Sequence, residues 1–143
     1  MTVTSILSVK GRDVVSIEPT ADLDTAAKLL AARRIGAVVV LGADDRLVGI
    51  LSERDIVKAF AERGTAALKE PVSQIMTRNV ATCSEDESIA SLMERMTSGK
   101  FRHMPVLKGT RLVGVVSIGD VVKDRLAMME QETEAMRDYI RSA

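Results

Sequence analysis

The chain has 143 residues, 46% of them hydrophobic, and its 20 Lys and Arg balance 20 Asp and Glu. This balance offers no broad cationic field to attract nucleic acid, and an aromatic content of 2% leaves few side chains to stack on bases. We therefore expect no nucleic-acid partner.

The sequence also argues against secretion and membrane insertion. The single cysteine, Cys83, cannot form an intrachain disulfide, and no secretory segment precedes the first predicted elements. No apolar run approaches the ~18 residues that a membrane helix needs. We expect a cytoplasmic protein without a membrane partner.

The first half alternates between strand and helix signals. A short β-branched strand is predicted at residues 14–17, followed by an amphipathic helix with apolar residues from Leu23 to Leu30. A hairpin is predicted next, with strands at residues 37–41 and 47–51, and a second helix begins near Ser52. Residues 62–65, followed by Pro71, are predicted to link this half to the next.

The second half repeats the same order. Strands are predicted at residues 80–82, 104–107 and 112–116, and a helix at residues 88–96 lies between the first two. A final helix begins at Ser117 and has no Gly or Pro after residue 120. Each half is therefore β-α-β-β-α, which predicts an α+β fold.

The final helix differs from the others because its apolar positions recur at alternating steps of three and four residues. These positions are Leu126, Met129, Thr133, Met136 and Ile140. This spacing is typical of a short coiled coil. Two interpretations remain open: the helix packs back on its own half, or it pairs with a second copy in a homodimer.

The two halves are copies of one another. Residues 49–55 and 114–120 both read Gly, two apolar residues, Ser, two variable residues and Asp, and residues 3–8 resemble residues 72–77. Half of a 143-residue chain makes a marginal core by itself, so we expect the copies to share one compact module. The predicted limits are residues 1–68 for the first repeat and 69–143 for the second.

The repeated motif allows two interpretations. Ser52 with Asp55, and Ser117 with Asp120, have the spacing of a capping box at the start of a helix, which is a purely structural role. The same geometry also suits a nucleotide, because a helix N-terminus attracts phosphate and a carboxylate can accept two hydrogen bonds from a ribose.

Taken together, the two motifs, the segment at residues 102–106, the entry at residues 75–77 and the element order resemble the cystathionine β-synthase (CBS) domain pair, or Bateman module. The resemblance covers nearly the whole chain. It implies two repeats packed about a pseudo-twofold axis, with two clefts that bind adenosine-containing ligands such as AMP, ADP, ATP, NAD or S-adenosylmethionine.

The resemblance also implies roles for individual residues. Asp55 and Asp120 would hold ribose hydroxyls, with Ser52 and Ser117 beside the ribose and phosphate. Backbone and apolar side chains around the first strand and the hairpin entry of each copy would enclose the adenine; these are Val15, Ser16, Ile17, Ala37 and Val38, and Ala81, Thr82, Cys83, Met104 and Pro105.

The copies differ in the cations available for a phosphate. The second copy has Arg102 and His103 before Met104, where the first has Gly36 and Ala37. The first cleft could instead use Arg54, beside Asp55, or Lys10 from a segment without a counterpart in the second copy.

These observations lead to a functional prediction. One His and one Cys are too few for a typical zinc site, and no Walker-type loop or Gly-x-Gly-x-x-Gly motif is present, so we expect no metal, no catalytic cofactor and no enzyme activity. We predict a regulatory sensor of adenosine ligands that acts in trans on an effector protein. The alternatives are an interaction module without a ligand and an enzyme acting on adenine nucleotides.

Overall fold

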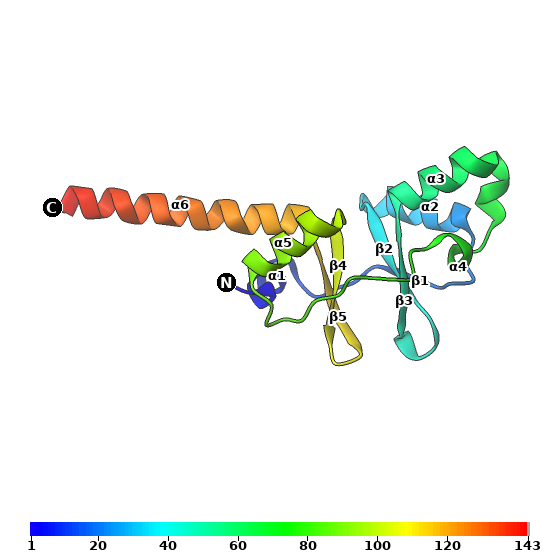
Figure 1. Ribbon diagram of the computed structural model, residues 1–143, viewed down its shortest axis with the longest axis horizontal. Coiled ribbons are helices and arrows are strands. Elements are labelled where there is room, and N and C mark those ends of the chain that lie inside the picture. Colours follow the sequence, from blue (N-terminus) through cyan, green and yellow to red (C-terminus); the bar gives the residue numbers. More distant parts are fainter. Residues whose placement is uncertain (143) are drawn as a thin grey trace.

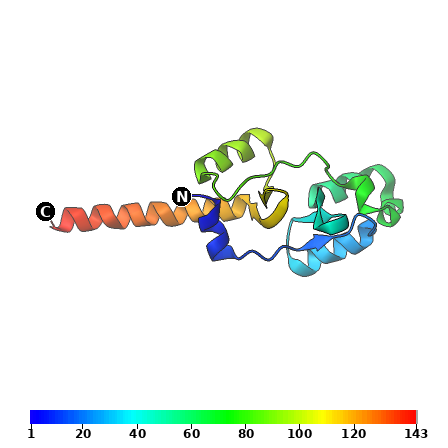
Figure 2. The same ribbon diagram turned by 90° about the horizontal axis from the view of Figure 1, so that it is seen from below.

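The computed structural model describes residues 1–142 as two similar halves, from the second of which a long helix projects (Figures 1 and 2). The first half contains β1 (Ser16–Ile17), α2 (Leu23–Arg33), β2 (Ala37–Leu41), the 3₁₀ turn η1 (Ala43–Asp45), β3 (Leu47–Ser52), α3 (Glu53–Arg63) and the 3₁₀ helix η2 (Gly64–Lys69). The second half contains α5 (Ile89–Gly99), β4 (His103–Lys108), β5 (Arg111–Ser117) and α6 (Ile118–Ser142). A short helix precedes each half: α1 (Val3–Lys10) and α4 (Val72–Ile75). The predicted α+β fold with an extended C-terminal helix is confirmed.

The equivalent helices α2 and α5 begin and end at similar capping residues. The side chain of Asp22 caps α2 by accepting a 2.8 Å hydrogen bond from the backbone N of Thr25, and Ser88 caps α5 in the same way. These caps satisfy backbone N–H groups that have no partner within the helix. The two helices also end alike, on basic residues with left-handed backbones, Arg34 at φ 55° and Lys100 at φ 57°.

The two sheets are less alike than the repeats predict. β1 pairs in parallel with β2, which pairs antiparallel with β3, whereas the second sheet contains only β4 and β5. The strand predicted at residues 80–82 is wrong, because only Cys83 forms a bridge to β4, at Val106. Extending that parallel ladder toward Ala81 would need a backbone N–H at Pro105, and proline has none.

The halves exchange their entry helices. The buried residues of α1, Val3, Ile6 and Leu7, belong to the core of the second half. Conversely, Val72 of α4 and Met76 after it belong to the core of the first half. Backbone hydrogen bonds hold this exchange in the same way on both sides, because Leu23 N donates to Glu70 O and Ile89 N donates to Met1 O.

Only the second core combines segments that are not contiguous in the sequence. The core of the first half extends from Val15 to Met76, and the core of the second joins residues 3–7 to residues 81–121. The repeat limits expected from the sequence, residues 1–68 and 69–143, stay a prediction, because they divide the chain by its repeats and not by its packed cores. Neither half is complete without the entry helix that crosses from the other side.

The first glycine of each motif makes room for the exchanged segment. A Cβ atom at Gly49 would lie 2.6 Å from Met76 Sδ and 2.9 Å from Thr77 O, and one at Gly114 would lie 2.8 Å from Leu7 Cδ2. Both contacts are closer than van der Waals packing allows. Packing therefore accounts for the glycine in each motif, and this position needs no chemical role.

Candidate functional site

Both motifs form capping boxes at the start of a helix. In the first, Ser52 N donates to Asp55 Oδ2 at 2.9 Å, and Asp55 N donates to Ser52 Oγ at 3.3 Å. In the second, the equivalent distances between Ser117 and Asp120 are 2.9 and 3.1 Å. The predicted structural role of both pairs is therefore present. The capping role does not exclude ligand binding, because one carboxylate oxygen can accept the hydrogen bond of the cap while the other accepts one from a ligand.

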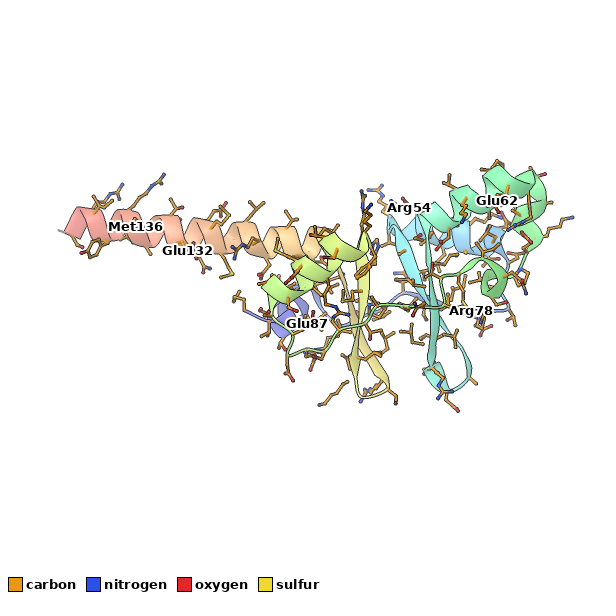
Figure 3. All side chains as sticks on the ribbon, viewed as in Figure 1. Arg54, Glu62, Arg78, Glu87, Glu132 and Met136 are labelled. Atoms are coloured by element: carbon orange, nitrogen blue, oxygen red, sulfur yellow. The ribbon has the colours of Figure 1, made fainter. Side chains whose placement is uncertain are left out.

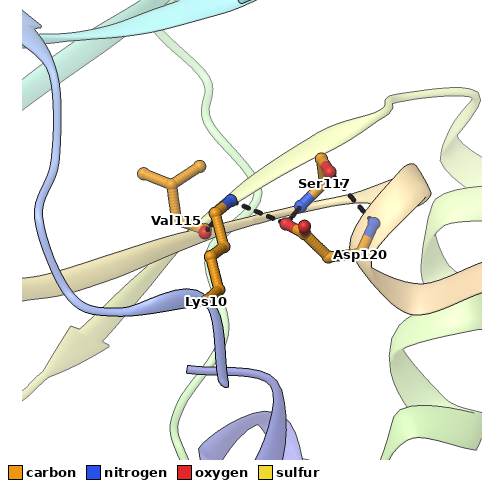
Figure 4. Close-up of polar contacts among 4 residues, drawn as sticks. All are labelled: Lys10, Val115, Ser117 and Asp120. Atoms are coloured by element: carbon orange, nitrogen blue, oxygen red, sulfur yellow. Dashed lines mark hydrogen bonds and ion pairs between the residues drawn. The ribbon is translucent and has the colours of Figure 1, made fainter. Parts of the chain in front are cut away.

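The two carboxylates differ in their remaining contacts. Asp55 Oδ1 accepts a long, 3.5 Å hydrogen bond from Thr77 Oγ1. Asp120 Oδ2 instead forms an ion pair with Lys10 Nζ at 2.6 Å, and within residues 1–142 its Oδ1 has no hydrogen-bond partner (Figure 4). The second motif therefore presents one unused acceptor oxygen beside a cation.

Lys10 reaches this position from the last turn of α1, which ends at Gly11 with φ 97°. Its ammonium group also donates to Val115 O at 2.8 Å (Figure 4). In the first half, the equivalent carbonyl, Ile50 O, accepts a hydrogen bond from the backbone N of Thr77. The lysine side chain thus takes the place of a backbone donor and brings a positive charge with it.

These contacts keep Asp120 ionised. Partial burial raises the pKa of the Asp120 carboxyl, but the hydrogen bonds from Lys10 and Ser117 outweigh it, so its pKa lies below the ordinary value. Burial also lowers the pKa of His103, and the charge of Lys10 lowers it further. At neutral pH Asp120 is therefore ionised and the imidazole of His103 is neutral.

A cleft of about 300 Å³ opens between the halves next to this group. Its lining residues come from both halves and from the segment after α1: Lys10, Asp13, Val14, Val15, Arg34, Ile35, Gly36, Ala37, Val39, Ile50, His103, Val115 and Ser117. The volume falls at the lower end of the range for small-molecule sites. One part of the wall is apolar, and Lys10, Arg34 and His103 supply nitrogen donors.

His103 closes the cleft against the first half. A Cβ atom at Gly36 would lie 3.4 Å from His103 Cε1, so the imidazole packs almost directly on the backbone before β2. Nearby, Glu53 N donates to Gly36 O, and Ile118 N makes the equivalent bond to Arg102 O. Equivalent positions of the two copies, Ala37 with His103 and Ile50 with Val115, line the same cleft, which therefore lies near the pseudo-twofold axis.

The structure brings together only part of the predicted set. Lys10, Val15, Ala37, His103 and Ser117 line the cleft, and Asp120 contacts it through Lys10. Residues 13–15 and 34–37 of the first copy thus line the cleft together with Ser117 of the second motif, although Ala37 also pairs with Ser52 of its own motif in the hairpin. The predicted residues that do not line this cleft are Ser16, Ile17, Val38, Ser52, Arg54, Asp55, Ala81, Thr82, Cys83, Arg102, Met104 and Pro105.

Two predictions about these residues need correction. Lys10, predicted for the first motif, contacts the second, because α1 packs on the second half. The side chains of Val38, Cys83 and Met104 are buried in the two cores, so these residues can offer an adenine only their backbone. Arg54 is exposed at the start of α3 (Figure 3).

Sequence reasoning missed eight lining residues: Asp13, Val14, Arg34, Ile35, Gly36, Val39, Ile50 and Val115. One signal for Arg34 was available, because a basic residue, Lys100, occupies the equivalent position of the second copy. No comparable signal exists for Ile50 or Val115, which are ordinary strand residues. They line the cleft because the hairpins of the two halves lie side by side (Figure 1).

Cys83 is predicted to be unreactive. Burial, and secondarily the charge of Glu87, raise the pKa of the Cys83 thiol to about 12, and the residue is 6% exposed. Because the thiolate is the reactive form, we expect iodoacetamide at pH 8 to label the folded protein far more slowly than the urea-unfolded protein. Mass spectrometry of both samples tests this, and equal labelling rates would contradict the buried position.

Two further properties concern metals and membranes. Among residues 1–142, no three His, Cys, Asp or Glu side chains are placed to hold a metal ion together. None of the helices within this range is both long and apolar enough to cross a bilayer.

Comparison with known proteins places these features in a family. The model of the CBS domain matches the chain twice, at residues 6–62 and 72–126. The chain belongs to the CBS-domain family. The two matches contain the two motifs and account for the duplicated architecture.

Solved CBS-domain structures are closely similar. A CBS-domain containing protein from Agrobacterium tumefaciens is 50% identical, with a TM-score of 0.85 over 87% of this chain and 92% of that one. A CBS domain protein from Pyrobaculum aerophilum, solved in complex with AMP, is 32% identical, with a TM-score of 0.79 over 93% and 99% of the two chains. A CBS domain pair solved with 5′-methylthioadenosine and S-adenosyl-L-methionine is 27% identical, with a TM-score of 0.80 over 90% and 98%. Related CBS pairs thus bind adenosine-containing ligands.

Proposed function

We propose that this CBS pair is a regulatory module that binds an adenosine ligand carrying a 5′-phosphate, such as AMP, ADP, ATP or NAD, in the cleft between its halves. The observation that carries the proposal is the arrangement of Ser117, Asp120 and Lys10 at the edge of that cleft. Complexes of similar CBS pairs with AMP and with S-adenosyl-L-methionine support the adenosine part.

Each part of such a ligand has a suitable counterpart. The unused Oδ1 of Asp120 would accept a hydrogen bond from the ribose diol, with Ser117 beside it. The apolar side chains of Val14, Val15 and Ile35 would pack on the adenine. The phosphate would lie near the N-terminus of α6 and the cations of the cleft.

The charges of the cleft favour a phosphate over a sulfonium ligand. Lys10 and Arg34 both line the cleft, and Asp13 is the acidic residue in its lining; Asp120 contacts Lys10, and Glu53 lies near Gly36. A ribose bound to Oδ1 of Asp120 would leave the contact of Lys10 with Oδ2 in place, and the third N–H of the ammonium group could donate to an anion. S-adenosylmethionine brings a positive sulfonium and an ammonium group beside a single carboxylate, so it would gain less from Lys10 than a nucleotide phosphate would.

The ligand would regulate by bridging the halves. It would contact residues 13–15 and 34–37 on one side, and Lys10, His103 and Ser117 on the other. A bridging ligand changes the geometry of the pair only when it binds one arrangement more tightly than another. In this proposal the module has no catalytic role, works as a homodimer, and passes the change to an effector protein in trans.

Isothermal titration of AMP, ATP, NAD, S-adenosylmethionine and adenosine tests this proposal. We expect the phosphorylated ligands to bind and Lys10→Met to weaken AMP binding about tenfold, because a hydrogen bond to a charged group is lost. Adenosine binding should change less. Lys58→Met, which removes an exposed lysine on α3, is the matched control and should bind like the wild type.

Other outcomes would favour the alternatives. If no adenosine compound binds, the motifs act as caps only, and the protein is an interaction module. If the nucleotide is consumed during prolonged incubation, as measured by chromatography of the mixture, the protein is an enzyme. If Lys10→Met and Lys58→Met bind AMP equally well, the phosphate does not contact Lys10.

A further inference from the structure

The second half of α6 has no contact that would stabilise it within one chain. Residues 129–142 of this helix are all exposed, and they extend away from the module (Figures 1 and 2). An isolated helix of this length is marginal in water, and helices in proteins are stabilised mainly by packing of an apolar face. The interpretation in which the helix packs back on its own half is therefore wrong.

One face of the helix is apolar along its length. Leu126, Met129, Met136 and Ile140 are between 54% and 67% exposed, and Val122 is 46% exposed. Together with Thr133, they occupy successive a and d positions of a heptad repeat, with Val122 at d and Leu126 at a. Figure 3 shows Glu132 and Met136 on the projecting part.

The module does not obstruct this face. Beyond Asp120, the more buried residues of α6 are Val121, Asp124 and Met128. In the same heptad they occupy positions c, f and c, on the side of the helix opposite to a and d. The apolar face is thus directed away from the chain's own helices, and a second helix can lie along it from Val122 to Ile140.

The charged residues that flank the apolar face select one orientation. In a parallel pair in register, each g residue lies next to the e residue five positions later in the partner. Arg125 then meets Glu130 of the second copy, and Glu132 meets Arg137, so both pairs have opposite charges. In the antiparallel pair with full overlap, like charges would meet instead. Glu130 would lie close to Glu130 of the second copy, Glu132 close to the second Glu132, and Lys123 close to Arg137.

We propose that α6 pairs with α6 of a second copy as a parallel coiled coil in register, which joins two CBS modules at one end. The apolar face supplies the contact, and the alternating signs at g and e supply the orientation. The inference does not depend on nucleotide binding. It predicts that the dimer persists in the ligand-free protein and in variants of the cleft.

Sedimentation of the full chain tests the pairing. We expect a dimer, and we expect the double variant Met129→Glu with Met136→Glu to raise its dissociation constant about tenfold or more, since charges would enter the seam. Both residues are exposed in the monomer, so the module should remain folded by circular dichroism. Ala135→Glu, which adds a charge at position c, is the control and should stay dimeric.

Cross-linking tests the orientation. An Ile140→Cys variant should form a covalent dimer on mild oxidation, because equivalent a positions face each other in a parallel pair. In the antiparallel pair, residue 140 would lie beside residue 122, roughly 27 Å from its own counterpart. Asp138→Cys, at the outer position f, is the control and should cross-link much less. A monomeric wild type, or an Ile140→Cys variant that cross-links no better than the control, would overturn the proposal.

Discussion

Replacing Leu7 with alanine is expected to lower the free energy of unfolding by about 2–5 kcal/mol, the usual cost of a large cavity in a core. Leu7 is 1% exposed and lies in the core of the second half, although it precedes the first half in the sequence. Its side chain also packs on Gly114 at the start of the second motif. Urea unfolding monitored by circular dichroism measures the change.

Val9 on the same helix provides the matched control. It is 83% exposed, so Val9→Ala should change the free energy of unfolding by no more than about 0.5 kcal/mol. If Leu7→Ala were equally mild, α1 would not be part of the second core, and the exchange of entry helices would be incorrect. The comparison separates loss of packing from a general effect on helix stability.

Replacing Asp120 with asparagine is expected to weaken AMP binding about 10- to 100-fold. Asparagine keeps the size of the side chain and one carbonyl oxygen, but it lacks the negative charge, and a hydrogen bond to a charged group contributes about 1.5–3 kcal/mol, more than a bond to a neutral one. It also breaks the ion pair with Lys10, which lies 2.6 Å from Asp120 Oδ2. Calorimetric titration of AMP measures the loss.

Asp55→Asn is the control for this variant, because it alters the equivalent capping box. We expect it to cost a similar amount of stability and to leave AMP binding in the cleft near Lys10 unchanged, since Asp55 does not line that cleft. Equal losses of affinity in both variants would mean that the ligand depends on the fold of the pair rather than on Asp120. Thermal unfolding of both proteins checks that they remain folded.

The predictions for Leu7 and Asp120 both depend on the position of α1. Leu7 fixes the helix in the second core, and Lys10, one turn later, reaches Asp120 and Val115 O. Whatever moves Lys10 therefore acts on a helix that stabilises half of the molecule. A ligand that binds both Asp120 and Lys10 would be coupled to the packing of α1, which gives the proposed regulation a physical route.

Much of this protein follows from interactions between residues close together in the sequence. The caps at Ser52 and Ser117, the hairpins and the length of α6 depend on spacings of a few residues, and all appear where the sequence predicts them. The duplication itself, and with it the CBS family, was visible in the repeated motif. Local patterns also suffice for the apolar face of α6, because heptad spacing is a property of one helix.

The site was decided by tertiary structure. Lys10 and Asp120 are separated by 110 positions and meet because α1 crosses to the second half. The packing of the two halves brings residues 13–15 and 34–37 of one copy beside Ser117 of the other, a combination that no repeat alignment indicates. Pro105 removes a ladder hydrogen bond whose partner is 24 positions earlier, and so shortens a strand that local composition favours. In each case the deciding contact joins segments that only the packing of two cores brings together, and a local pattern carries no information about that packing.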